Sequence, residues 1–308
     1  MNVQTIRKNR WKRYVRESWQ LYTLLLPAVM LTVIFCYWPM YGAQIAFRNY
    51  KIKLGIWGSE WVGLKYFIQF VTGNNFWQLL KNTLGLNFYE LVVGFPAPIL
   101  LAFMLNEIRR QKFKKTVQMI TYAPHFISTV AVCGLITLFV EREAGIINLI
   151  IELFGGTKKD FLADPDCFKT IYVISDVWKG LGWGTIIYLA TLSSVDAEIV
   201  EAAYIDGASR MQKIIYIDFP CLLPTIIILL VLRAGSMMSV GYEKILLLQN
   251  ALNMRSSDVI STYVYRLGIE NAQYSLTTAI GLFNSVVNVI LLTLVNFLAK
   301  QMSSISLW

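Results

Sequence analysis

The chain has 308 residues, of which 56% are hydrophobic and 15% are charged, and its mean hydropathy is +0.52. Soluble domains are about 45–50% apolar and about 25% charged, so this composition excludes an ordinary soluble protein and predicts a membrane protein. The formal net charge of +9 does not indicate nucleic-acid binding, because the basic residues gather beside apolar segments, where lipid head groups and topology account for them.

A basic N-terminal segment, 1–20, precedes the first apolar segment, about 21–42. A membrane-spanning helix needs roughly 20 predominantly apolar residues. This first segment is too long for a signal-peptide core and is followed by "CYWPMYG", which has no small-residue cleavage site. We therefore expect it to be retained as a helix.

Further apolar segments predict the rest of a single domain over 21–308. They lie at about 84–105, 119–140, 170–192, 222–242 and 277–299. The segment 170–192 is the weakest, because Asp176 and Lys179 interrupt it. The runs are continuous and do not alternate as the strands of a β-barrel do. The sequence predicts an all-α polytopic membrane protein with six transmembrane helices.

Lys and Arg favour the cytoplasmic side of short loops. The segments "RKNRWKRYVRESW" and "NEIRRQKFKKTVQ" flank the first three helices on one side. We expect both termini and the loop 193–221 to be cytoplasmic. The loops at about 43–83, 141–169 and 243–276 are expected outside.

The loop 193–221 is polar although it lies between two apolar segments. The residues Ala197 to Ala208 favour a helix, Gly207 can end it, and Pro220 and Pro224 suit the first turn of the next helix. We expect a short helix, a bend and a second short helix. Small residues allow another protein's backbone to approach closely, and Glu201 and Asp206 offer charge-assisted contacts. The loop is therefore interpreted as a docking surface.

The same loop resembles a known family. The pattern Glu-Ala-Ala, Gly, Ile and Pro has the spacing of the EAA loop of ATP-binding-cassette (ABC) importer permeases of type I, with Phe219 where Leu is usual. The matching positions, to which the resemblance assigns ATPase coupling, are Glu201, Ala202, Ala203, Asp206, Gly207, Ala208, Ile217 and Pro220. In that family this loop is the coupling helix between helices 4 and 5.

Other stretches resemble the branch of carbohydrate permeases that import oligosaccharides and polysaccharides. They are "YWPMYGAQIAFRNYK", "WVGLKYF", "GYEKILLLQN", "DVISTYVYRLG" and the terminal "SLW". The resemblance implies a bacterial plasma-membrane subunit that imports complex sugars. It also implies the partners: a second homologous permease, two copies of a cytoplasmic ATPase that bind ATP and Mg, and an extracellular solute-binding lipoprotein.

The chain itself has no phosphate-binding loop, since "GGTKKD" lacks both the spacing and the hydroxyl. No nucleophile motif, cofactor site or metal-ligand spacing occurs, His125 is expected to pack or to form a hydrogen bond, and the four cysteines predict no disulfide framework. We therefore expect a transport subunit rather than an enzyme. A permease for another solute such as peptides is the main alternative, and a non-transporting membrane enzyme or assembly factor is a remote one.

Sugars are recognised by aromatic faces and by hydrogen bonds from amides and carboxylates. The candidates for the substrate path are Trp178, Trp183, Tyr188, Tyr242, Glu243 and Asn284. Each aromatic residue among them also fits the alternative of an anchor at the membrane interface.

Two charged residues lie within apolar segments, Glu90 in "NFYELVVG" and Arg233 in "LLVLRAGSMM". Neither is expected to face lipid. At a rise of 1.5 Å per residue they differ in depth by roughly 6 Å, which an Arg side chain can reach. We predict that they pair inside the bundle. The alternatives are that Arg233 faces a water-filled path or a partner permease, and that Glu90 bonds to a hydroxyl.

Overall fold

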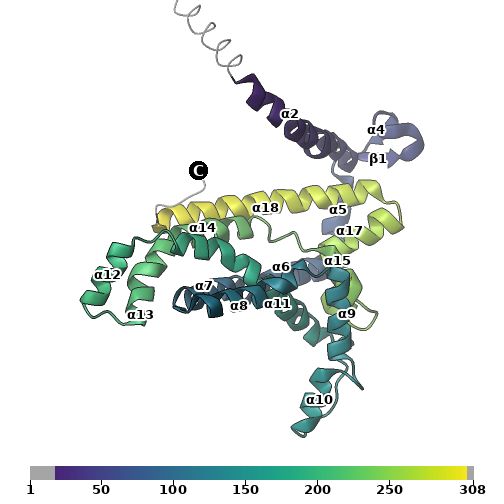
Figure 1. Ribbon diagram of the computed structural model, residues 1–308. Helices are drawn as coiled ribbons and strands as arrows, with labels where there is room; N and C mark the ends of the chain where they lie inside the picture. The colour runs from purple at the N-terminus through teal and green to yellow at the C-terminus, as the bar shows by residue number, and fades with distance from the viewer. Residues whose placement is uncertain (1–17, 304–308) are drawn as a thin grey trace, which may run out of the picture.

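The computed structural model describes residues 18–303. Most of the predicted basic segment 1–20 and the terminal "SLW" lie outside these residues. The described chain is built from helices and one small hairpin (Figure 1). Four helical segments are long and apolar enough to cross a membrane: Trp19–Phe47, Phe76–Asn106, Arg210–Ala234 and Tyr274–Gln301. A fifth is added if the bent pair Gln111–Phe126 and Thr129–Val140 is one span.

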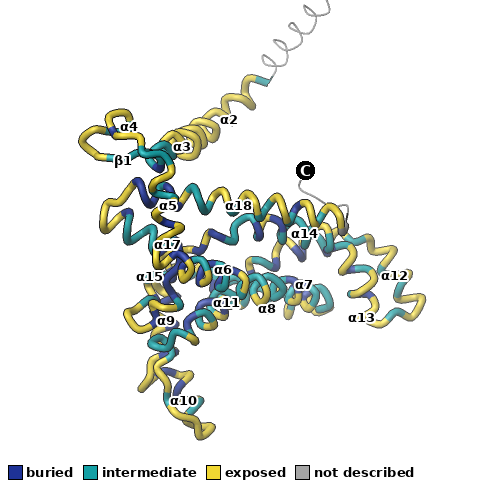
Figure 2. Tube along the Cα trace, turned by 180° about the vertical axis from the view of Figure 1, so that it is seen from behind, coloured by how far each residue is buried: buried dark blue, intermediate teal, exposed yellow. Residues whose placement is uncertain are grey.

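Most of the first span, Trp19–Met40, stands apart from the other helices (Figures 1 and 2), whereas its last part, Tyr41–Phe47, packs against the last helix. It contains α2 (Trp19–Thr32), a π-helical turn (Val33–Tyr37), α3 (Trp38–Met40) and a 3-10 helix (Tyr41–Phe47). None of its most apolar window is buried within the chain. Its apolar side chains therefore need a cover that this chain does not supply.

A small hairpin follows this span. Strands β1 (Arg48–Lys51) and β2 (Ser59–Trp61) are antiparallel, with Arg48 opposite Trp61. Between them lie a 3-10 turn (Ile52–Leu54) and α4 (Gly55–Gly58), and α5 (Lys65–Val71) comes after. The Tyr50 N–H donates to Ser275 Oγ at 2.9 Å, which ties the hairpin to the start of the last helix.

The second span consists of α6 (Phe76–Val93) and α7 (Pro96–Asn106). Pro96 lies in the first turn of α7, where a backbone N–H would have no partner within the helix, so the helix tolerates proline there. This span agrees with the predicted segment 84–105, and it extends eight residues further toward the N-terminus. Polar residues such as Asn82 and Thr83 in that extension are buried against other parts of the chain. A hydropathy scale scores them as unfavourable and therefore makes the predicted segment too short.

The predicted continuous helix 119–140 is wrong. The structure has α8 (Gln111–Tyr122), a 3-10 turn (Ala123–Phe126) and α9 (Thr129–Val140), with a bend of 101° between the two parts. Pro124 disfavours the helical conformation of the residue before it and cannot donate a backbone hydrogen bond. Ser128 then caps α9, because its Oγ accepts from the Ala131 N–H at 3.3 Å.

The weakest predicted segment, 170–192, forms part of α11 (Pro165–Leu192). This helix is 28 residues long, but it is not among the spans that are apolar enough to cross a membrane, because it carries Asp176 and Lys179 near its middle. Asp164 caps its first turn by accepting from the Asp166 N–H at 2.8 Å. A hydrogen bond from Lys159 lowers the pKa of Asp164.

The predicted segment 222–242 also needs a correction. Its helix, α14 (Phe219–Ala234), ends eight residues early, since Gly235 begins a turn. The segments between the long helices contain α10 (Ile146–Leu153), α15 (Tyr242–Leu248), α16 (Met254–Ser257), α17 (Ile260–Tyr265) and a π-helical turn (Arg266–Glu270). The last helix, α18 (Tyr274–Ser303), includes the predicted segment 277–299.

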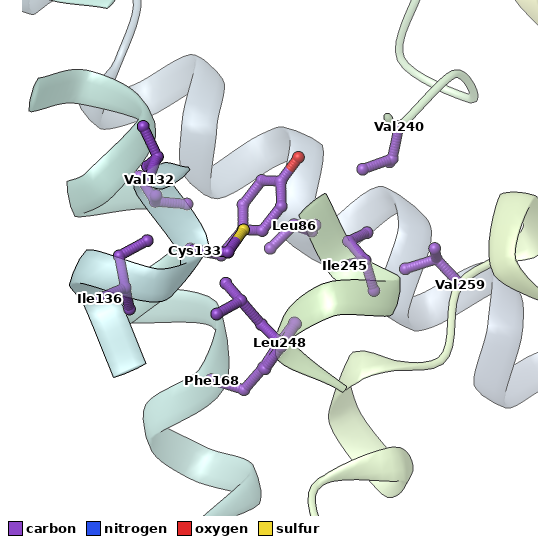
Figure 3. Packing of buried hydrophobic residues seen from close by; sticks show 11 residues of the cluster. Leu86, Val132, Cys133, Ile136, Phe168, Val240, Ile245, Leu248 and Val259 are labelled. Carbon is purple, nitrogen blue, oxygen red and sulfur yellow. The ribbon is translucent and has the colours of Figure 1, made fainter. Parts of the chain in front are cut away.

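Three apolar clusters hold these helices together. One joins α6, α9, α11 and α15 around Leu86, Cys133, Phe168 and Ile245 (Figure 3). A second joins α5, α6, α17 and α18, and a third joins α7, α11 and α14. α11 takes part in the first and the third cluster. It therefore packs against α6, α9 and α15 at one end and against α7 and α14 at the other.

Candidate coupling loop and intramembrane cavity

The loop between α11 and α14 forms a projection at one end of the molecule (Figure 1). It contains α12 (Ala197–Ile205), α13 (Arg210–Lys213) and a π-helical turn (Ile214–Asp218). Asp196 caps α12 by accepting from the Glu198 N–H at 2.9 Å. No residue of α12 is buried. The expected short helix and bend are present, but the second short helix runs directly into the membrane helix.

Gly207 makes the bend. Its φ of +79° lies in the left-handed region that favours glycine. The N–H of Ala208 donates to the Ala203 carbonyl at 2.9 Å, and the Gly207 N–H donates to the Tyr204 carbonyl at 3.1 Å. These two bonds close the carboxyl end of α12 as a Schellman motif. Gly207 therefore ends the helix as the sequence predicts.

The structure brings most of the predicted coupling residues to one recess of about 250 Å³ between α12 and α13. Of the predicted set, the recess is lined by Ala203, Asp206, Gly207, Ala208 and Ile217. Glu201 and Ala202 lie outside it and are exposed on α12, and Pro220 is exposed in the first turn of α14.

The same projection exposes apolar side chains. Ile205 is 86% exposed and Tyr216 is 74% exposed. Exposed apolar groups beside exposed carboxylates are typical of a surface that another protein covers.

The predicted ion pair between Glu90 and Arg233 is present. Their side chains lie on α6 and α14, and both line a cavity of about 310 Å³. Asp176, Gly180 and Gly184 of α11 form another part of its wall. The Arg233 side chain is 38% exposed, and both members of the pair line the cavity. The expected pairing is therefore confirmed, and whether this cavity belongs to a water-filled path stays a prediction.

A second ion pair lies beside this cavity. Lys244 donates to Asp176 Oδ1 at 2.6 Å and to the Tyr172 carbonyl at 2.8 Å. Its Nζ also lies 4.2 Å from the centre of the Tyr172 ring. The sequence shows Asp176 only as an interruption of an apolar segment. Its partner, 68 residues further along the chain, cannot be found by spacing.

The aromatic candidates for the substrate path separate into different places. Tyr188 is buried and lines the charged cavity. Trp183 is half exposed and stacks on His125, with ring centres 4.4 Å apart. Trp178 lines a different, mostly apolar cavity of about 540 Å³ between α9 and α11. His125 therefore packs on an aromatic ring, as one of its two expected roles requires.

The remaining candidates are not next to the charged cavity. Tyr242 stacks on Tyr265 with ring centres 5.3 Å apart, and Glu243 lies in the first turn of α15. The Oδ1 atom of Asn284 on α18 is buried and has no hydrogen-bond donor among the residues described. Whether any of the six binds sugar stays a prediction.

Sequence reasoning missed a buried ion cluster at the base of the projection. Lys213 Nζ lies 2.6 Å from Glu107 Oε1 and 3.1 Å from Asp218 Oδ2. A spacing of five residues does not place two side chains on one face of an α-helix, so the pattern gave no signal. Within residues 18–303, no group of His, Cys, Asp and Glu is arranged to hold a metal ion.

The fold and these features define a helical, multi-pass membrane protein with charged residues inside its bundle and an exposed loop at one end. The family model described as "Binding-protein-dependent transport system inner membrane component" matches residues 94–304. The chain therefore belongs to this family, whose members are permease subunits of transporters and not enzymes.

Two relatives come from Bacillus subtilis (strain 168). Protein LplB is 44% identical over 93% of this chain and 90% of its own length. The polygalacturonan/rhamnogalacturonan transport system permease protein YteP is also 44% identical, over 91% of this chain and 88% of its own length.

A solved structure is similar in fold. It is a crystal structure of a bacterial ABC transporter involved in the import of the acidic polysaccharide alginate. The matched chain is 39% identical, with a TM-score of 0.87 over 96% of this chain and 99% of that one. A second crystal structure, of a bacterial alginate ABC transporter in complex with an alginate pentasaccharide-bound periplasmic protein, matches with the same identity, TM-score and coverage.

Proposed function

We propose that this chain is one permease subunit of an ATP-driven ABC importer that takes up oligosaccharides or fragments of polysaccharides. The observation that carries the proposal is the projecting loop with Glu201 and the Gly207 bend, in a chain whose similar proteins include importers of polysaccharides. These similar proteins favour a carbohydrate over the alternative of a peptide.

The loop offers the surface that an ATPase needs. Small residues line its recess, and Glu201, Asp206 and Ile205 are exposed around it. ATP and Mg would bind to two copies of a cytoplasmic ATPase and not to this chain. ATP can shift the membrane domain only if it favours one of two states, and the contact with this loop would carry that preference.

The proposed membrane arrangement has six spans, with α11 as the fourth and the bent pair α8 and α9 as the third. Both termini and the loop 193–221 lie in the cytoplasm of a bacterium. One ion pair of α11 supports its inclusion, since Asp176 is paired with Lys244 and does not face lipid as a free charge.

A second, homologous permease completes the proposed membrane domain. The first span supports this partner, because its apolar surface is not covered by its own chain. Such a surface needs either lipid or another apolar helix. The outer region, which contains α10, α15 and α16, would receive a sugar-loaded binding protein.

The cargo is tested by binding. The cognate solute-binding protein would be titrated calorimetrically with oligogalacturonides, alginate oligosaccharides, arabino-oligosaccharides and a mixture of dipeptides. Tight binding of one sugar class supports the proposal and names the cargo. Binding of dipeptides without binding of any sugar would contradict it.

A further inference from the structure

The base of the proposed coupling loop is held by three ionisable residues. Lys213 lies in α13, Asp218 ends the π-helical turn, and Glu107 follows the last residue of α7. The Lys213 and Asp218 side chains are 8% and 1% exposed, and Glu107 is 16% exposed. Asn106 adds a hydrogen bond from Nδ2 to Asp218 Oδ2 at 3.3 Å. We name Glu107, Lys213 and Asp218 the basal triad.

The π-helical turn is what brings two members of the basal triad together. In an α-helix of 3.6 residues per turn, residues five apart point about 140° away from each other. In the turn Ile214–Asp218 the hydrogen bonds span five residues, as in the bond from the Phe219 N–H to the Ile214 carbonyl. Lys213 therefore lies over Asp218 and reaches it at 3.1 Å.

Lys213 is the centre of the basal triad. It is a cation paired with both Glu107 and Asp218, and Asp218 Oδ1 is buried without a donor among residues 18–303. Buried carboxylates are costly unless a cation and hydrogen bonds compensate them. Neutralising Lys213 alone therefore leaves two carboxylates together with no cation.

The basal triad is also the first buried contact after α12. No residue of α12 is buried, and the bend at Gly207 lies in open space. Ser209 and Gln212 then form a capping box, with the Ser209 N–H 2.7 Å from Gln212 Oε1. This rigid turn ends at Lys213, whose side chain reaches across to the end of α7.

We propose that the basal triad is a positioning device that couples the docking loop to the second membrane span. It fixes the base of the loop to the cytoplasmic end of α7, so that a displacement of α12 moves α7 as well as α14. Without the basal triad, α12 moves on the π-helical turn while α7 stays in place. The inference rests on the proposed docking of an ATPase to this loop.

Four variants test the device in the complete transporter, with both permeases, the ATPase and the binding protein in proteoliposomes. Lys213→Met leaves two unpaired carboxylates. The triple variant Glu107→Gln, Lys213→Met, Asp218→Asn removes every charge of the triad while conserving shape. Lys213→Arg keeps the cation. Lys115→Met removes an exposed cytoplasmic cation on α8 and is the matched control.

The first measurement is the number of tritium-labelled oligogalacturonide molecules imported per ATP hydrolysed. We expect this ratio to fall at least fivefold in the triple variant, which assembles normally, and to stay within twofold of wild type in Lys213→Arg and Lys115→Met. We expect Lys213→Met to reduce the amount of assembled complex as well.

The second measurement does not depend on the cargo. Hydrogen exchange of the amides in residues 206–218, followed by mass spectrometry on the assembled complex, should be at least tenfold faster in the triple variant than in wild type. If the wild-type complex imports no oligogalacturonide, this sugar is not the cargo and the ratio is measured with the sugar that the binding protein selects. The exchange measurement still tests the positioning device on its own.

Three results would overturn the inference. A triple variant with the wild-type ratio of import to hydrolysis would show that the basal triad has a structural role alone, even if exchange is faster. Unchanged exchange would show that the triad does not fix the loop. Failure of the triple variant to assemble would make its charges a requirement of folding and not of coupling.

Discussion

The ion pair of Glu90 and Arg233 shows that the position of a single charged residue can be predicted from its chemistry. Both lie in apolar segments, where an isolated charge costs about 2.5–3.5 kcal/mol. The estimate of their relative depth needs only the helical rise, and the structure joins them. What the sequence did not show is the cavity that they line with Asp176.

Arg233→Met tests this pair. The variant leaves Glu90 without its partner and should reduce stability in membranes, by less than the roughly 3–5 kcal/mol of a fully buried pair, because Arg233 is partly exposed to the cavity. The double variant Arg233→Met, Glu90→Leu should recover much of the loss. Thermal unfolding in detergent measures both, and a double variant no more stable than the single one would reject a stabilising pair.

Gly207 is a residue whose backbone conformation limits its replacements. A Cβ at this position meets open space, so only the positive φ opposes a side chain. Gly207→Ala should cost about 1–2 kcal/mol at the end of α12, and Gly207→Asn, which tolerates this conformation, should cost less. Hydrogen exchange of residues 201–208 measures the difference. Equal exchange in both variants would contradict the role of the left-handed bend.

At the scale of elements, hydropathy predicted the helices whose apolar segments contain no backbone turn. The segments 84–105 and 277–299 fall within helices of the structure. The segments 119–140 and 222–242 were placed less well, because hydropathy does not register the break after Pro124 or the turn at Gly235. Both are changes of backbone conformation within an apolar sequence.

The ionisable residues of α11 explain why this helix was the weakest prediction. Asp176 pairs with Lys244, and Lys179 Nζ lies 3.3 Å from Thr129 Oγ1. Asp176 is paired with a cation and Lys179 is hydrogen-bonded to a hydroxyl, and both partners are distant in the chain. A hydropathy scale scores each charged residue as unfavourable and takes no account of its partner. The short helix and the bend of the loop 193–221 were predicted correctly because their pattern is local.

Asn148 connects α10 to the segment before α11. Its side chain donates to the carbonyls of Glu141 and Lys159 and accepts from the Lys159 N–H, at 2.9–3.0 Å. Asn148→Ala should therefore destabilise this segment by about 1–3 kcal/mol. Limited proteolysis between 154 and 163 should be faster than in wild type, with the exposed Asn74→Ala as control. Equal cleavage would show that these bonds do not hold the segment.

At the scale of the whole molecule, the proposed orientation follows from the basic loops and is tested by labelling. A cysteine replacing Ser194 should be protected from an impermeant reagent added outside, and one replacing Gly156 should react. The background must lack the four native cysteines, of which Cys36 is exposed. The reverse pattern of labelling would overturn the topology and with it the cytoplasmic docking loop.

The central claim is that an ATPase drives this permease through the loop that contains Glu201 and Gly207. The most direct test is ATP hydrolysis by the reconstituted transporter with its sugar-loaded binding protein, for wild type, Glu201→Ala and Gly207→Arg. Removing the Glu201 contact should weaken docking by about 1–3 kcal/mol, and Arg at position 207 should block close approach. We predict that both variants keep a folded membrane domain and lose sugar-stimulated hydrolysis, whereas normal stimulation in both would contradict the account.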